Sequence, residues 1–278
     1  MSFATLMVHV EFEPKADARV RLAAGLADRH ASALIGISAS VLPPYPSENG
    51  YFVTGAFLEQ ERRDILAALA RAEAAFRAAA GRCGGPAGAA LEWRSAVELP
   101  ENYVVAQARS ADLVIVGKAQ GEVDIARALD PGTAILKAGR PVLVVPPGVD
   151  TLKAERVLVA WKDGREARRA VKDALPLLRG ALSVAIVEVC EVGSEAEGRQ
   201  HAEDVARYLA RHRISVGKVM TAAATASVAD HLIEAATAHG ADLLVAGGYG
   251  HSRLGEWIFG GVTRDLLRSS PVCCLFAH

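Results

Sequence analysis

A glycine-rich stretch near the carboxyl end carries the residues best suited to chemistry. It reads Gly247-x-x-Gly250, nine further residues, and then Gly260-Gly261-Val262-Thr263. Glycines let a backbone approach a ligand closely, and the free N–H groups at the start of a helix attract an anion. Thr263 would add a hydroxyl in the first turn of that helix. Two such backbone clusters in one loop could bracket a sugar and a phosphate chain.

The same glycines could instead serve only to make turns. The pattern is neither that of a P-loop nor the usual dinucleotide fingerprint. Between the two clusters lie His251, Ser252 and Arg253. His251 and Arg253 could contact a phosphate, or they could lie at a solvated loop tip.

The elements that must position this loop follow from the hydrophobic pattern of the second half. Apolar or β-rich runs predict strands at 157–161, 183–189, 216–221, 243–246 and 272–276. Helical spacing predicts helices at 165–179, 195–211, 227–239 and 262–269, with Gly180 and Gly240 as stops. This alternation predicts a parallel sheet covered on both faces. Ligands of such sheets lie beyond the carboxyl ends of the strands, which is where the loop after residue 246 begins.

The first half repeats the second. Residues 111–117 align with 241–247 at an offset of 130, and the same offset matches Thr133 with Thr263. The starts of the halves, 6–10 and 157–161, match at a larger offset, so the first half has a longer middle, which we place in the loop-like run 43–50. We therefore expect two units, residues 1–148 and 153–278.

Composition narrows the range of functions. The 278 residues include 31 Lys and Arg against 32 Asp and Glu, a net charge of −1 that exerts no general attraction on nucleic acid or anionic lipid. The start of the chain does not resemble a signal peptide, and no apolar run approaches the ~20 residues of a membrane span. None of Cys83, Cys190, Cys273 and Cys274 forms a C-x-x-C pair, which favours free buried thiols. We expect a cytoplasmic protein with neither a nucleic-acid nor a membrane partner.

The glycine spacing resembles the G-x2-G-x9-G-[ST] signature of the UspA-like universal stress proteins. Ala241-Asp242 before the loop, Gly261-Val262-Thr263 after it and Ser270-Pro271-Val272 before the last strand agree with this family. The resemblance covers essentially the whole chain as a tandem pair. It implies an α/β fold of two tandem five-stranded, mostly parallel sheets with helices on both faces, Rossmann-like and of the adenine-nucleotide α-hydrolase type. The last strands, 142–145 and 272–276, would join the halves as an internal pseudo-dimer.

The resemblance also implies that the C-terminal half binds ATP, ADP or AMP, with Mg²⁺. The first glycine would lie near the ribose, and the later loop and helix start would hold the phosphates. The residues implied in binding are Ala160, Trp161, Lys162, Val189, Gly247, Gly250, His251, Ser252, Arg253, Gly260, Gly261, Val262 and Thr263.

The sequence departs from the family pattern at several positions. Gly261 replaces the final Ser or Thr of the signature, with Thr263 as a substitute hydroxyl. Lys162 stands where the family has an Asp near the adenosine, and it could neutralise phosphate or simply be solvated. In the first half, Gln120 stands opposite Gly250, and Asp130-Pro131 replaces the second glycine pair. An acidic residue repels phosphate and proline lacks an N–H donor, so we do not expect the N-terminal half to bind ATP.

These observations predict a nucleotide-responsive regulatory protein of the stress response rather than a fast enzyme, with no assigned catalytic or metal-binding residues. A protein–protein interaction scaffold with a vestigial pocket and a slow ATPase or hydrolase are the alternatives. An unidentified protein partner and a further homo-oligomer are compatible with each of them.

Overall fold

The computed structural model describes residues 2–12, 16–42, 54–81, 90–118, 126–224, 227–250 and 261–278. In the N-terminal half the strands are β1 (Thr5–His9), β2 (Ala33–Ala39), β3 (Leu91–Ala96), β4 (Leu113–Gly117) and β5 (Val142–Val145). Its helices are α1 (Ala16–His30), α2 (Gly55–Gly81), α3 (Pro100–Gln107), the short 3₁₀ helix Ala108–Ser110 and α4 (Pro131–Lys137).

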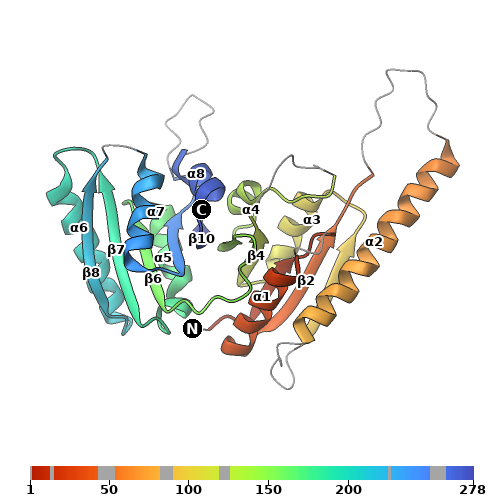
Figure 1. Ribbon diagram of the computed structural model, residues 1–278, viewed down its shortest axis with the longest axis horizontal. Coiled ribbons are helices and arrows are strands. Elements are labelled where there is room, and N and C mark those ends of the chain that lie inside the picture. The colour runs from red at the N-terminus through yellow and green to blue at the C-terminus, as the bar shows by residue number, and fades with distance from the viewer. Residues whose placement is uncertain are drawn as a thin grey trace.

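The C-terminal half repeats this order. Its strands are β6 (Arg156–Trp161), β7 (Ser183–Cys190), β8 (Val216–Ala223), β9 (Leu243–Gly247) and β10 (Cys273–Ala277). Its helices are α5 (Arg165–Leu178), α6 (Glu195–Arg211), α7 (Val228–His239) and α8 (Gly261–Ser269). Figure 1 shows the two halves side by side, each with strands alternating with helices.

The strands form one ten-stranded sheet in the order β3-β2-β1-β4-β5-β10-β9-β6-β7-β8. Every neighbouring pair is parallel except β5 and β10, which pair antiparallel with Leu143 opposite Leu275. The α/β fold and the pairing through the last strands are thereby confirmed. The two expected sheets are continuous with each other, because the backbone groups at the edge of each last strand are satisfied by the other half.

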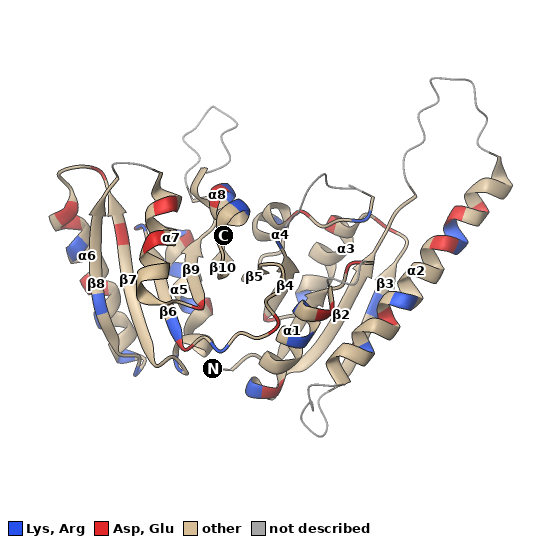
Figure 2. Cartoon of the chain, viewed as in Figure 1, with Lys and Arg blue, Asp and Glu red and all other residues tan. Residues whose placement is uncertain are grey.

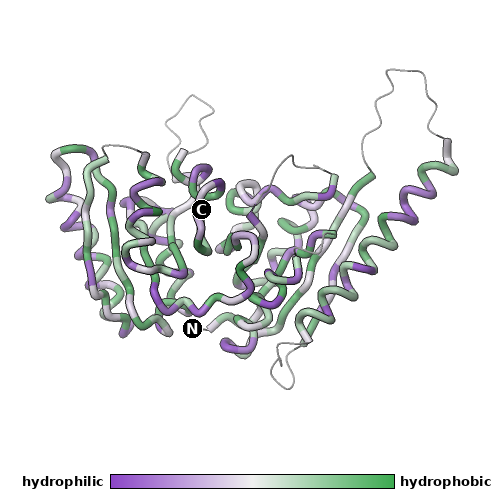
Figure 3. The backbone as a smooth tube through the Cα atoms, viewed as in Figure 1, coloured by the Kyte–Doolittle hydropathy of each residue, from purple (hydrophilic) through white to green (hydrophobic). Residues whose placement is uncertain are grey.

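Helices cover both faces of this sheet. Buried residues of α1, α2, α5 and α6 pack in one cluster, and those of α3, α4, α7 and α8 pack in another on the opposite face. The adjacent Cys273 and Cys274 fall in different clusters, as strand alternation requires. Figure 3 shows apolar strands between helices that carry most of the hydrophilic residues.

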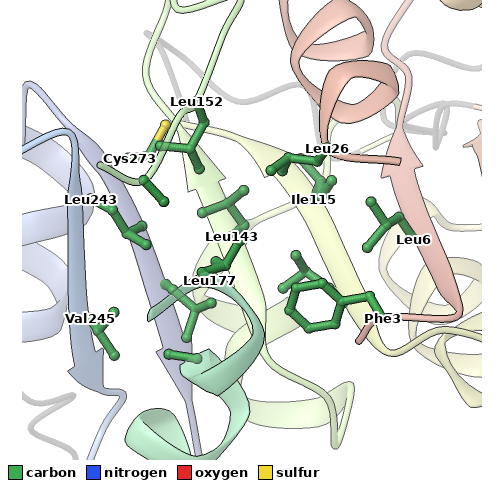
Figure 4. Packing of buried hydrophobic residues seen from close by; sticks show 14 of the residues in the cluster. Phe3, Leu6, Leu26, Ile115, Leu143, Leu152, Leu177, Leu243, Val245 and Cys273 are labelled. Atoms are coloured by element: carbon green, nitrogen blue, oxygen red, sulfur yellow. The ribbon is translucent and has the colours of Figure 1, made fainter. Parts of the chain in front are cut away.

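The core crosses the junction between the halves without interruption. In Figure 4 the side chains run from Phe3 and Leu6 through Leu143 to Leu243 and Val245. Leu143 is fully buried although it belongs to an end strand of its own half. The halves therefore share apolar packing as well as backbone hydrogen bonds, as a tightly associated dimer would.

The first half is longer partly because of one helix. α2 has 27 residues, whereas its counterpart α6 has 17. The run 43–50, expected to hold the extra residues, lies outside the described part of the chain. Figure 2 shows charges of both signs alternating along α2 and the other helices, which agrees with the near-zero net charge. Among the described helices, none has both the length and the apolar character needed to cross a bilayer.

Candidate functional site

The strand order reverses at the centre of the C-terminal half. Strands β6 and β9 are parallel neighbours there, yet the chain continues from β6 toward β7 on one side and from β9 toward β10 on the other. The loops that leave their carboxyl ends diverge, and such a divergence is where parallel α/β sheets place their ligands. The glycine-rich loop after β9 starts at this point.

The first glycine of the loop has a packing role. A Cβ on Gly247 would lie 2.7 Å from the amide nitrogen of Ala167 and 2.9 Å from the carbonyl carbon of Glu166. Glycine is required here because the first turn of α5 approaches the end of β9 so closely. Its expected place near a ribose stays a prediction.

The next glycine of the pattern faces a carboxylate. A Cβ on Gly250 would lie 2.8 Å from Oε2 of Glu166. His251, Ser252, Arg253 and Gly260 lie outside the described residues.

At the end of the loop, α8 begins at Gly261. Val262 is 36% exposed, whereas Thr263 is buried. The hydroxyl of Thr263 accepts a hydrogen bond of 3.1 Å from the backbone N–H of Tyr249. Thr263 therefore fastens the start of the loop to the start of the helix, a use of its hydroxyl that the sequence pattern did not suggest.

The site residues expected at the ends of β6 and β7 lie on opposite faces of the sheet. Ala160 and Val189 pack on the face covered by α7 and α8, and the buried Trp161 packs on the other. Cys190 accepts a hydrogen bond of 2.8 Å from Ala224 beyond β8, so the backbone of Val189, one residue earlier, is directed toward β6. Since the pairing of β6 with β7 ends at Trp161 opposite Glu188, this backbone lies at the end of β6.

Lys162 is exposed and lies near a buried acid. Nδ1 of His201 lies 3.7 Å from Oε1 of Glu188, which is 4% exposed. Burial raises the pKa of Glu188, and the charges of His201 and Lys162 oppose this rise. Glu188 shares the face of Trp161, so this cluster and the Ala160–Val189 surface lie on opposite sides of the sheet.

Glu166 is a site residue that the sequence analysis did not identify. Its side chain is only 8% exposed, and Oε1 accepts a hydrogen bond from Nε of Arg165. Burial by itself would raise the pKa of Glu166, but hydrogen bonds from Arg165 and from its own backbone, with the charges of Arg165 and His278, hold the pKa below its ordinary value. The available signal was an acidic residue in the first helical turn after the first strand of the unit.

The glycine-rich loop also contacts the N-terminal half. A Cβ on Gly132 in α4 would collide with the hydroxyl of Tyr249, and a Cβ on Gly248 would lie 2.5 Å from Cγ2 of Ile135 in the same helix. Burial, together with the charge of Asp130, raises the pKa of Tyr249. The loop thus belongs both to the candidate site and to the junction between the halves.

The matching positions of the N-terminal half are filled by the protein itself. The guanidinium of Arg19 lies where a Cβ on Gly117 would project, and its Nε donates 3.0 Å to the carbonyl of His9. Glu11 lies 3.3 Å from the same guanidinium. Burial, reinforced by the charge of Arg19, lowers the pKa of His9 to about 3.

The helix start in the N-terminal half is also occupied. Asp130 caps α4 by accepting hydrogen bonds of 2.7 Å from the N–H and 2.9 Å from the hydroxyl of Thr133. Its carboxylate takes the position at the helix start that favours an anion. Pro131 follows as the first residue of the helix, without an N–H to donate. The site that the repeat would create in this half is therefore closed by Arg19 and Asp130.

A model of the universal stress protein family matches residues 153–278. A universal stress protein from Archaeoglobus fulgidus DSM 4304 has a similar structure, with a TM-score of 0.70 and 13% identity over 98% of this chain and 97% of that one. A functionally unknown protein from Pseudomonas aeruginosa PAO1 is similar with a TM-score of 0.58 and 13% identity, over 98% of this chain and 92% of that one. No curated protein matches the sequence significantly. Residues 153–278 therefore belong to the universal stress protein family, and the whole chain shares its fold with the universal stress protein from Archaeoglobus fulgidus.

Proposed function

We propose that the C-terminal half binds ATP or another adenine nucleotide, with Mg²⁺, and that the protein is a cytoplasmic regulator of the stress response. The observation that carries this proposal is the meeting, at the reversal of strand order, of a glycine-rich loop with the start of α8. The first N–H groups of a helix have no partner within that helix, and together with the helix dipole they favour a phosphate chain.

The residues around this point suit the parts of such a ligand. Ala160 would offer an apolar contact to a purine ring, and the backbone of Val189, beyond the last residue of β7 paired with β6, would bond to the edge of that ring. Gly250 leaves room that a Cβ would fill beside Glu166. Gly261 and Val262 would present the phosphate-binding amides, and any Mg²⁺ would be held mainly by the phosphates.

A protein-interaction scaffold is favoured by one specific observation: two residues of the glycine motif make contacts within the protein. Gly247 packs against α5, and Thr263 bonds to Tyr249, so both have structural roles that need no ligand. A scaffold would keep this geometry and bind no nucleotide. Direct binding measurements separate the two functions.

Isothermal titration of the whole protein with ATP, ADP and AMP, each with and without Mg²⁺ up to millimolar concentration, tests the proposal. Binding by the wild type that is weakened at least tenfold in Gly250→Val supports it. Gly25→Ala in α1 is the control, because a Cβ there meets no described atom within 4 Å. Failure of all three nucleotides to bind would favour the scaffold. Phosphate release from bound ATP, measured against denatured protein, would identify a slow ATPase.

A further inference from the structure

The Glu166 carboxylate lies between the two loops that define the candidate site. Its Oε2 lies 2.8 Å from the position of a Cβ on Gly250, after β9, and 3.4 Å from that of a Cβ on Gly164, after β6. Since β6 and β9 are neighbours in the sheet, Glu166 stands where their loops diverge. A ligand entering this divergence would meet the side chain of Glu166.

The two oxygens of this carboxylate have different surroundings. Oε1 accepts a hydrogen bond from Arg165, whereas Oε2 lies beside Gly250 and Gly164, two residues without side chains. Because hydrogen bonds and nearby positive charge hold the pKa of Glu166 below its ordinary value, the group is an ionised acceptor at neutral pH. A partly buried, ionised acceptor suits a ligand with hydroxyl donors.

The charge of Glu166 also orients the ligand. A carboxylate repels phosphate, so the phosphate chain must run away from α5 and toward the start of α8. The part of a nucleotide that joins the base to the phosphates is the ribose, and its 2′- and 3′-hydroxyls are donors that an acidic side chain accepts in other parallel α/β folds.

We propose that Glu166 is a specificity-determining residue that accepts a hydrogen bond from the ribose hydroxyls and selects ribonucleotides over deoxyribonucleotides. This inference rests on the proposed function, because it names which part of the nucleotide the site recognises.

Titration of the whole protein with ATP, 2′-deoxy-ATP and 3′-deoxy-ATP tests the inference. The wild type is expected to bind ATP at least about tenfold more tightly than one of the two deoxy analogues, the effect of a single hydrogen bond to a charged group. Glu166→Gln should reduce this ratio, and Glu166→Ala should bring it close to one. Asp230→Asn is the matched control, because Asp230 is an exposed acid in the first turn of α7, and it should keep the wild-type ratio.

The outcomes distinguish the inference from the function. If ATP binds but the wild type does not discriminate between the three ligands, or if Glu166→Gln and Glu166→Ala discriminate as the wild type does, Glu166 only stabilises the start of α5 and the inference is wrong while nucleotide binding stands. If no ligand binds to the wild type, both proposals fail. Thermal unfolding of each variant verifies that it is folded. If Glu166→Ala does not fold, the ratio measured for Glu166→Gln decides the test.

Discussion

The hydroxyl of Tyr249 lies against Gly132, so that the glycine-rich loop of one half contacts the first turn of the corresponding helix in the other half. A Cβ at residue 132 would collide with the Tyr249 oxygen but would lie 3.4 Å from Cζ of the same ring, an ordinary contact distance. The severe collision is therefore with the Tyr249 oxygen, which a single further substitution removes, and a milder crowding at 3.1 Å from Oδ2 of Asp130 remains.

Gly132→Ala should destabilise the protein by about 1–3 kcal/mol, the usual effect of overpacking a close contact. Adding Tyr249→Phe should recover most of this loss, because phenylalanine lacks the colliding oxygen. Urea unfolding of the two single variants and the double variant measures the coupling energy. Strict additivity of the two substitutions would show that residues 132 and 249 are not in contact.

The hydrogen bond between Tyr249 and Thr263 gives a second prediction. Thr263→Val keeps the shape of the side chain but leaves the Tyr249 N–H without its acceptor, which should lower the free energy of unfolding by about 1–3 kcal/mol. Thr263→Ser keeps the hydroxyl and should be the more stable of the two. Equal stability of the valine and serine variants in urea would contradict this bond.

The buried imidazole of His9 makes stability depend on pH. Its pKa is about 3 in the folded protein against an ordinary value of 6.5, so the unfolded chain binds more protons between these values. The neutral His9 therefore does not reduce the free energy of unfolding above pH 6.5. As the pH falls from 6.5 toward 3, protonation of His9 in the unfolded chain lowers the free energy of unfolding by up to about 1.4 kcal/mol per pH unit. His9→Leu should make the free energy of unfolding fall less steeply over this range.

Arg19 and Glu11 are the charged groups that face His9, and both remain in the His9→Leu variant. The difference between the pH profiles of wild type and variant therefore reports the protonation of His9 alone. Denaturant titrations of wild type and variant at several pH values between 7.5 and 4 provide the measurement. Parallel pH profiles for the two proteins would count against a buried, neutral His9.

The two glycines Gly247 and Gly25 should respond to alanine in opposite directions. Gly247→Ala brings a methyl group to 2.7 Å from the amide nitrogen of Ala167 and should destabilise the protein by about 1–3 kcal/mol. Gly25→Ala lies on the exposed side of α1, meets no described atom within 4 Å, and should stabilise by about 0.4–1 kcal/mol. Thermal unfolding midpoints compare them, and a neutral Gly247→Ala would mean that α5 and β9 are less closely packed.

Much of the fold could be predicted from local sequence patterns. The helix expected at 195–211 has those bounds, and the helix expected to end at Gly240 does so with that glycine in the left-handed conformation at φ 64°. The strands 142–145 and 272–276, expected to join the halves, pair as β5 and β10. These features depend on side-chain periodicity, on glycine stops and on an internal repeat, all of which can be read along the chain.

The roles of the individual site residues could not be predicted in this way. The sequence marks Gly247, Gly250 and Thr263 as one motif, but in the structure Gly247 makes room for α5, Gly250 faces Glu166, and Thr263 accepts a hydrogen bond from Tyr249. Each of these roles depends on a contact between segments that are distant along the chain or belong to different elements. Local pattern therefore identified the strands, the helices and the loop between them, whereas only packing in three dimensions decided which atoms of that loop are engaged by the protein and which face the candidate site.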